Sequence, residues 1–414
     1  MLSDLETQGG AAVGASRLAE GFIRAGVQVS RLVCFPDGQT HSWTTQPLRG
    51  SPRERLTWRA IQYPLKRLSV SAAAGAQRLW VHPLLRRELE ELKPDVISVN
   101  NLHGGDWWPT LVSDCTPHAP TVWTLHDMWS FTGRCAYSYD CRNFVSGCDA
   151  SCPTPSEYPA LPPRLIADSW ELRRRLLASN PRLVGVCPSK WLGREALAGL
   201  WKNHRIEVIP YGLDLNIYQP ANKEFARFVL GIDTPGPVLL VAAQQLEKRR
   251  KGGLIIGEAL QRILHRPLTV MTMGHGSLNV EAEGIYLHSL GYVDNEKKKV
   301  MVYSGADIVV HPAPVDNLPH VVMESIACGT PVVGFPVGGV VDMIRPGETG
   351  WLAEAVTSEA LASATDKALR DLHGGMDLRP TCRAVAESEY GIELQVRRYL
   401  ELFRSLRASG AITP

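Results

Sequence analysis

The sequence lacks the features that would place the chain across a membrane or on nucleic acid. It contains no run of 18 apolar residues, so we expect no transmembrane helix. Its first residues lack the basic and apolar pattern of a secretory signal peptide. It shows no nucleic-acid-binding motif and no internal repeat. These absences predict a cytoplasmic protein without a nucleic acid partner, which meets a membrane, if at all, at the inner face.

The chain also has little net charge, since 44 Lys and Arg nearly balance 42 Asp and Glu. The small excess is uneven, because residues 1–205 hold 24 Lys and Arg against 18 Asp and Glu. The N-terminal half is therefore the part that we expect to meet an anionic partner. Much of its excess lies between Arg49 and Arg87, interleaved with Trp58, Tyr63 and Trp80. This mixture suits a membrane surface or a lipid-linked phosphate, and a solvated helical face is the alternative.

The length of 414 residues predicts two domains and a tail, and 44% hydrophobic residues describe a globular chain. Short apolar segments alternate with amphipathic ones, which predicts an α/β fold with doubly wound parallel sheets. The expected strands are residues 27–35, 95–100, 121–125, 183–187, 238–243, 268–273, 285–290, 308–311 and 332–335. The expected helices are residues 15–25, 84–92, 163–178, 190–200 and 319–328, with a helical tail at 384–406.

Gly9 and Gly10 follow a short apolar segment and precede the first predicted helix. Backbone N–H groups at a helix N-terminus bind phosphate, so the glycine pair is a candidate cradle for a diphosphate. A plain tight turn is the alternative. Because few residues precede Gly9, we expect the first strand to begin before residue 1.

The segment from 307 to 342 is the most informative part of the chain. Two β-branched strands flank a helix that carries Glu324, and Asp316 lies eight residues before it. The second strand runs into Gly338 and Gly339, where a backbone can approach a ligand closely. Ligands of α/β sheets bind at the carboxyl ends of the strands, so these four residues are expected to face one crevice. Two surface acids beside a core helix are the alternative.

These features resemble the nucleotide-sugar site of glycosyltransferase family 4, whose members are retaining enzymes with the GT-B fold. The variant around residues 316–319 is similar to an exopolysaccharide branch of the colanic-acid type. The resemblance implies two Rossmann-like domains that face a central cleft, with a last helix that crosses back to the first domain. We expect an acceptor domain at 1–205, a donor domain at 206–380 and a helical tail at 381–414.

The resemblance also implies roles for individual residues. Glu324 takes the position that holds the ribose hydroxyls, and Asp316 takes that of a Glu which touches the donor sugar. The shorter Asp makes this second assignment less direct. Further donor-binding positions implied by the family are Gly9, Gly10, Leu318, Pro319, His320, Gly338 and Gly339.

A basic loop at 247–253 follows the first strand of the second predicted domain. Arg250 and Lys251 could neutralise a diphosphate, with Arg249 as a spare and a solvated basic loop as the alternative. The family more usually carries its Arg several residues earlier, in a Gly-Arg-Leu triplet. Here that place reads Gln244-Gln245-Leu246, so Lys251 matches the family more directly than Arg250 does.

His126 and Asp127 end a strand of the first predicted domain. The residues after them resemble the exopolysaccharide branch, in which this His lies against the donor sugar. His126 is therefore a candidate catalytic residue beside Asp316 and Glu324, and a structural histidine is the alternative.

Four of the nine cysteines, Cys135, Cys141, Cys148 and Cys152, lie within 18 residues. In a cytoplasmic protein this density suggests a structural zinc site. Reduced thiols without a metal and disulfides are the alternatives. No catalytic metal or other cofactor is expected, because basic groups serve the diphosphate.

The resemblance implies transfer of a sugar from a nucleoside-diphosphate sugar to a hydroxyl acceptor, with retention. We expect the acceptor to be a lipid-linked glycan or a surface polysaccharide precursor. A nucleotide-sugar epimerase of the same fold and a non-catalytic sugar-nucleotide-binding scaffold are the alternatives. The sequence identifies neither the sugar nor the base.

Overall fold

The computed structural model describes residues 1–48, 60, 64–65, 67–105, 107–233, 236–278, 280 and 282–410. Arg49, Trp58 and Tyr63 of the predicted basic stretch lie outside the described residues. The chain divides into two compact units, one formed by Met1–Pro210 with the residues from Gln395 onward, and one by Tyr211–Leu394. Among the described residues, no helix is long and apolar enough to cross a membrane.

The first unit contains a parallel sheet of seven strands in the order β3-β2-β1-β4-β5-β6-β7. Its strands are β1 (Leu2–Leu5), β2 (Ser30–Phe35), β3 (Thr44–Pro47), β4 (Ile97–Val99), β5 (Thr121–Thr124), β6 (Val184–Cys187) and β7 (Ile206–Val208). Its helices are α1 (Gly10–Arg24), α3 (Val70–Trp80), α4 (His82–Leu92), α5 (Val112–Cys115), α6 (Ile166–Ser179) and α7 (Lys190–Ala198). The strand order is that of a doubly wound sheet whose connections reverse direction between β1 and β4.

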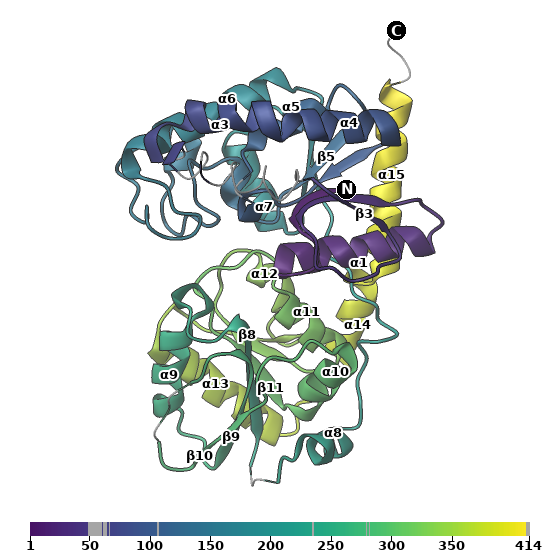
Figure 1. Ribbon diagram of the computed structural model, residues 1–414. Coiled ribbons are helices and arrows are strands. Elements are labelled where there is room, and N and C mark those ends of the chain that lie inside the picture. Colours follow the sequence, from purple (N-terminus) through teal and green to yellow (C-terminus); the bar gives the residue numbers. More distant parts are fainter. Residues whose placement is uncertain are drawn as a thin grey trace. The chain divides into compact units, whose positions relative to one another are not determined.

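The second unit repeats this design with six parallel strands in the order β10-β9-β8-β11-β12-β13. They are β8 (Val238–Gln245), β9 (Leu268–His275), β10 (Ile285–Ser289), β11 (Ile308–His311), β12 (Val332–Gly334) and β13 (Gly350–Leu352). The helices are α8 (Lys223–Leu230), α9 (Gly253–Arg262), α10 (Glu296–Gly305), α11 (His320–Ala327), α12 (Val340–Met343), α13 (Ser358–His373) and α14 (Arg379–Glu389). Figure 1 shows α9 and α13 on one face of this sheet and α10 and α11 on the other. The predicted α/β class with doubly wound parallel sheets is confirmed.

The central strands β8, β11 and β12 are buried along most of their length. Because helices cover both faces, each strand begins with a continuous apolar run and does not alternate with polar residues. Their side chains form the main hydrophobic core of the second unit together with Ile256 and Leu260 of α9 and Met323 of α11. The core thus fixes the strand ends and the loops that follow them.

The observed unit boundaries differ from the predicted ones. The first unit ends at Pro210, not at residue 205, because Ile206–Val208 is the edge strand β7, paired with β6. The predicted tail is two helices, α14 and α15 (Ile392–Gly410), since the chain bends where Gly391 bridges to Leu213. The first of these, α14, packs against α11 of the second unit.

The later part of α15 packs within the first unit. The ring of Phe22 on α1 lies 6.0 Å from that of Tyr399 and 5.6 Å from that of Phe403. The hydroxyl groups of Tyr399 and Thr124 lie 2.9 Å apart. Figure 1 shows α15 beside α1. These contacts explain why the chain from Gln395 onward belongs to the first unit.

Candidate functional site

The candidate site of the second unit centres on an ion pair between Lys251 and Asp316. Lys251 ends a short 3-10 turn, Arg249–Lys251, between β8 and α9, and Asp316 lies in the loop after β11. Nζ of Lys251 lies 2.6 Å from Oδ2 of Asp316. Since β8 and β11 are neighbours at the point where the strand order reverses, the pair occupies the usual ligand position of a doubly wound sheet.

Burial and neighbouring charges shift the pKa values of both residues of this pair. Burial alone would raise the pKa of Asp316, but the positive charges of Lys251 and Arg250 outweigh it and hold that pKa well below its usual range. Burial, together with the charge of Arg250, lowers the pKa of Lys251 against the opposing effect of Asp316. The sequence-predicted residues Arg250, Lys251 and Asp316 therefore act on one another, and the site combines a carboxylate with a concentration of positive charge.

His311, which the sequence prediction did not include, lies at the end of β11 beside this pair. Its Nε2 atom lies 3.7 Å from Oδ2 of Asp316 and is buried without a hydrogen-bond partner. Burial lowers the pKa of His311 to about 4, so the imidazole is neutral at physiological pH. Sequence reasoning could have identified His311 from its position at a strand end, five residues before Asp316.

The turn at Gly338 and Gly339 packs directly on the backbone of Asp316. Gly338 has a φ of 54°, and a Cβ atom there would lie 2.0 Å from the carbonyl oxygen of Asp316. The backbone N–H of Gly339 donates to the same oxygen at 3.2 Å. Only glycine fits at Gly338, and the turn holds the Asp316 loop in place.

Glu324 is buried on α11, the helix that follows this loop. Its Oε2 atom accepts a hydrogen bond of 2.8 Å from the hydroxyl of Tyr303, a fully buried residue of α10. Burial and the adjacent carboxylate raise the pKa of Tyr303 well above its usual value, so the phenol remains a donor. Tyr303 thus orients Glu324, a contact that the spacing of the two residues in the sequence did not reveal.

Leu318, Pro319 and His320 form the entry to α11. The carbonyl of Pro319 accepts the first hydrogen bonds of the helix, from the N–H groups of Val322 and Met323. The ring of His320 stacks on Tyr211 with centroids 4.9 Å apart and planes at 19°. The backbone of this segment therefore begins a helix directly after the Asp316 loop, and the positive end of that helix is a suitable place for an anionic group.

In the first unit, Gly9 and Gly10 lie where β1 turns into α1. Gly9 is the residue before the helix, with a φ of 88°, and its carbonyl accepts from the N–H of Val13 at 2.9 Å. Helix α1 begins at Gly10, earlier than the predicted start at residue 15. The glycine pair thus stands at a helix N-terminus, as the cradle prediction requires.

His126 and Asp127 have different surroundings in the first unit. His126 is buried, with Nε2 3.2 Å from Oδ1 of Asn100 at the end of β4. Asp127 pairs with His103, whose Nε2 atom lies 2.8 Å from its Oδ2 atom. Against the effect of burial, Asp127 raises the pKa of His103. The sequence prediction missed His103 because nothing in the spacing connects it to Asp127.

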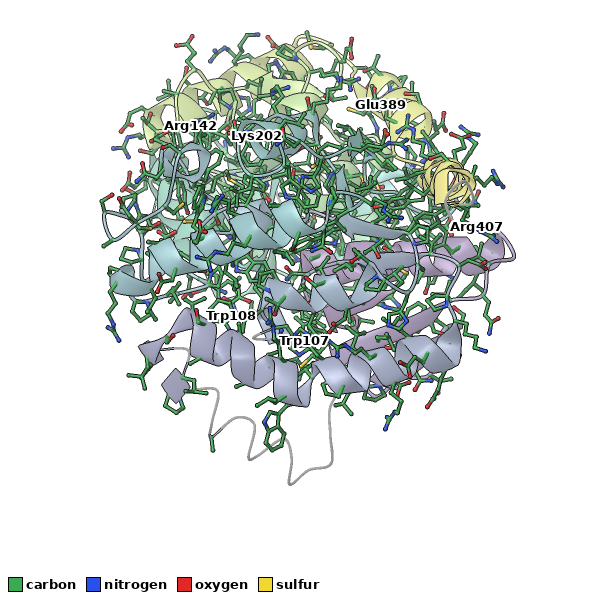
Figure 2. The ribbon with its side chains drawn as sticks, turned by 90° about the horizontal axis from the view of Figure 1, so that it is seen from above. Trp107, Trp108, Arg142, Lys202, Glu389 and Arg407 are labelled. Atoms are coloured by element: carbon green, nitrogen blue, oxygen red, sulfur yellow. The ribbon has the colours of Figure 1, made fainter. Side chains whose placement is uncertain are left out.

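A cavity of about 550 Å³ lies within the first unit. It is lined by His103, by aromatic residues including Trp107, Trp108 and Trp129, and by Arg67 and Arg173. The side chain of Gln77 on α3 holds the Trp108 backbone in two directions, with hydrogen bonds of 2.7 and 3.1 Å. Figure 2 shows Trp107 and Trp108 in this unit. Aromatic faces and cationic groups suit a ligand that combines sugar rings with negative charge.

The four clustered cysteines line one separate, small cavity in the first unit. Burial raises the pKa of the Cys135 thiol to about 12 and that of Cys148 to about 11. None of the nine cysteines forms a disulfide. The described His, Cys, Asp and Glu side chains include one trio with ligand atoms within 4.8 Å of one another, Glu6, Asp37 and His41.

The Glu6 carboxylate of that trio is already engaged by protein donors. It accepts hydrogen bonds from the indole of Trp43 at 2.9 Å, from the hydroxyl of Thr45 and from the backbone N–H of Asp37 at 3.0 Å. These hydrogen bonds stabilise the buried Glu6 carboxylate, so its burial requires no bound cation.

Solved structures of similar fold define the class of protein. The chain is similar to sucrose-phosphate synthase from Thermosynechococcus elongatus, with a TM-score of 0.71, 18% identity and coverage of 98% of this chain and 96% of that one. It is also similar to Anabaena Alr3699/HepE, solved with UDP-glucose, with a TM-score of 0.66, 16% identity and 98% coverage of both chains. The two Rossmann-like units are those of the GT-B glycosyltransferases.

Family models identify the particular family. Residues 8–217 match the model described as Glycosyltransferase Family 4, and residues 236–371 match that described as Glycosyl transferases group 1. The chain belongs to glycosyltransferase family 4, as its sequence motifs predicted.

Two curated relatives add detail. The chain is 27% identical over 227 residues to the putative colanic acid biosynthesis glycosyl transferase WcaC of Escherichia coli K12, covering 54% of this chain and 53% of that protein. It is 29% identical over 208 residues to a D-inositol 3-phosphate glycosyltransferase of Rhodococcus erythropolis, covering 47% of each. The chain thus matches about half the length of these relatives, and the first supports the predicted colanic-acid-type branch.

Proposed function

We propose that the protein is a retaining glycosyltransferase that moves a sugar from a nucleoside-diphosphate sugar to a hydroxyl acceptor of cell-envelope polysaccharide synthesis. The observation that carries this proposal is the Lys251–Asp316 pair, held by the Gly338 turn at the switch point of the second sheet. A cation and a carboxylate beside glycine backbone suit a ligand that joins a diphosphate to a sugar.

Each group of the second unit has a role in this proposal. Arg250 and Lys251 receive the charge that develops on the leaving diphosphate. Glu324, oriented by Tyr303, holds the ribose hydroxyls. Asp316 and the backbone from Leu318 to His320 position the sugar.

Residues of the first unit complete the assignment. In this proposal the N–H groups at Gly9 and Gly10 donate to a phosphate group, and His126 serves as a hydrogen-bonding group for a sugar.

The reaction breaks the bond between the anomeric carbon and the diphosphate oxygen, whose electron pair stays with the diphosphate. The acceptor oxygen forms the new bond on the same face of the sugar, and its proton leaves with the departing phosphate. We assign no covalent nucleophile. Exclusion of water by closure of the protein around the donor would prevent its hydrolysis.

The name of one structural neighbour supports the choice of donor class, because Alr3699/HepE was solved with UDP-glucose. For the acceptor, the first-unit cavity is lined by the aromatic side chains of Trp107 and Trp108 and by the cation of Arg67. Sugar rings stack on aromatic faces, and guanidinium groups bind phosphate. A lipid-linked glycan diphosphate has both features, so we propose it as the acceptor class, with contact at the inner membrane face.

Product analysis tests this function. The purified chain is incubated with UDP-, GDP- and ADP-sugars, with and without lipid-linked acceptors, and the products are resolved by mass spectrometry and NMR. We expect transfer with an unchanged anomeric configuration. An isomerised donor in the absence of acceptor would identify an epimerase, and donor binding without turnover across the acceptor panel would identify a scaffold.

A further inference from the structure

The segment between residues 132 and 162 needs an explanation that the transferase reaction does not provide. Its one regular element is the 3-10 turn Asn143–Val145, so about 30 residues run without a helix or strand. Loops of this length are uncommon in compact domains unless something other than regular hydrogen bonding holds them. Its first residues, 132–136, are nevertheless buried in the first unit, as are Ser138 and Phe144.

Four cysteines of this segment line one small cavity. Cys135, Cys141, Cys148 and Cys152 all line a single cavity of about 10 Å³. This volume is that of about one water molecule, so the cavity suits a single small ion better than an organic ligand. All four cysteines come from one irregular segment, and none of them forms a disulfide.

Close packing brings the middle of the segment against its first residues. A Cβ atom at Gly133 would lie 2.7 Å from Cβ of Cys148 and 2.6 Å from Cγ2 of Ile166. Because Gly133 has no side chain, the chain around Cys148 can approach the turn that contains Cys135.

Positive charge is buried beside these thiols. Arg134 and Arg173 are almost fully buried, and among the described residues neither forms an ion pair with a carboxylate. Arg173 donates to the carbonyls of Trp129 and Ser169, both at 2.8 Å. Arg134 lines the cysteine cavity, and its Nε donor is buried without a hydrogen-bond partner. Burying two guanidinium charges costs free energy unless negative charge lies nearby.

We propose that the thiolates of Cys135, Cys141, Cys148 and Cys152 bind one Zn²⁺ ion in a closed, structural site. Zinc with four thiolates carries a net charge of −2, which balances the charges of Arg134 and Arg173. Binding replaces the four S–H protons by bonds to the metal, so up to four protons are released. The sulfur set has no open position for substrate, and the ion takes no part in the transfer.

The site also explains how the adjacent cavity keeps its shape. Arg134, next to Cys135, donates to the carbonyls of Glu157 and Pro159 and to Thr154 Oγ1. The chain from Pro155 to Pro163, directly after Cys152, forms one wall of the 550 Å³ cavity. A zinc ion that closes the segment would therefore hold this wall.

Binding is expected to contract the segment. No three of the four sulfur atoms lie within 4.8 Å of one another. Around a tetrahedral zinc with bonds near 2.3 Å, the sulfur atoms lie about 3.8 Å apart. The ion would therefore draw the thiols inward and protect the segment from proteases.

Metal content tests the proposal independently of transferase activity. The full chain is purified under reducing conditions without chelator, and zinc is measured by plasma mass spectrometry. We expect about one zinc ion per chain, and almost none in the Cys135→Ser/Cys148→Ser double variant. Cys34→Ser is the matched control, because Cys34 belongs to the same unit but does not line the cavity. This control should keep the full zinc content.

A second measurement applies if the double variant does not fold. Cobalt is exchanged into the wild-type chain, and a thiolate-to-metal charge-transfer band with tetrahedral visible absorption is expected. A strong chelator should remove the metal and speed proteolysis between residues 139 and 162, and added zinc should reverse this. A chain without bound metal in which all four thiols react with a thiol reagent would overturn the proposal, as would disulfides among them.

Discussion

Nζ of Lys251 lies 2.6 Å from Oδ2 of Asp316, and these two residues reach one another from loops that follow adjacent strands. The pair places a partly buried cation against the carboxylate that family resemblance assigns to the donor sugar. In our proposal a donor diphosphate becomes a second partner of Lys251, so the same ammonium group positions Asp316 and receives the leaving group. The predictions below follow from this arrangement.

Lys251→Ala should lower kcat/KM for transfer by about 10²–10³-fold, because one preorganised cation at the leaving group is lost. Lys248→Ala is the matched control, since Lys248 is an exposed lysine of the same loop. Steady-state transfer assays with both variants decide the point. Near-normal activity of Lys251→Ala would remove Lys251 from the site.

Glu324→Gln should weaken donor binding by about 1–3 kcal/mol, since a charged hydrogen bond to the ribose is replaced by a neutral one. Tyr303→Phe removes only the 2.8 Å hydrogen bond that orients the carboxylate, so its effect should be smaller. Calorimetric titration with the donor measures both. An equal effect of the two variants would indicate that Glu324 acts only within the fold.

Gly338→Ala should destabilise the second unit strongly, because the new Cβ would collide with the Asp316 carbonyl at 2.0 Å. Gly347→Ala is the control, as Gly347 also has a positive φ, of 81°, but nothing lies within 4 Å of its added Cβ. Both variants incur backbone strain, of about 1–2 kcal/mol. We expect Gly338→Ala to cost at least about 2 kcal/mol more in urea unfolding. Equal losses would contradict the close approach.

Acid should destabilise the second unit through His311. Its folded-state pKa, about 4, lies below the unfolded value of about 6.5. The stabilising contribution of the neutral imidazole is therefore complete above pH 6.5 and is lost as the pH falls toward 4. Between pH 7 and pH 5 the loss should be about 2 kcal/mol.

The His311→Asn variant isolates this contribution, because it removes the titrating group and leaves Asp316, Lys251 and Arg250 around it. Its unfolding free energy should fall less than that of the wild type over the same pH range. Equal pH dependence of the two proteins would show that His311 is not the group responsible.

The central elements could be predicted from the sequence because burial on both faces gives a strand a clear signature. The runs at 308–311 and 238–243 are continuous and apolar, and the observed strands β11 and β8 match or extend them. The strands β3, β7 and β13 were missed. Thr44–Pro47 is a partly exposed edge strand without an apolar run, and Gly350–Leu352 has three residues next to a turn. Such strands are held by their neighbours more than by their own composition.

The site residues that lie in loops directly after strands could be predicted from the sequence. Lys251, Asp316 and the Gly338 turn come together because the loops after β8, β11 and β12 meet at one edge of the sheet. The supporting partners could not be predicted, since Tyr303 and Glu324 meet from two different helices. Their contact depends on side-chain directions that only packing defines.

The measurement that tests the central claim most directly is a thermal-shift screen of the wild type and the Lys251→Ala and Lys248→Ala variants with UDP-, GDP- and ADP-sugars. A ligand at 100 times its Kd stabilises the state that it binds by about 2.7 kcal/mol. We predict a raised melting temperature with one nucleotide class, retained in Lys248→Ala and lost in Lys251→Ala. A cooperatively melting wild type that responds to none of these sugars, or a Lys251→Ala variant that responds fully, would contradict the assignment of the donor site.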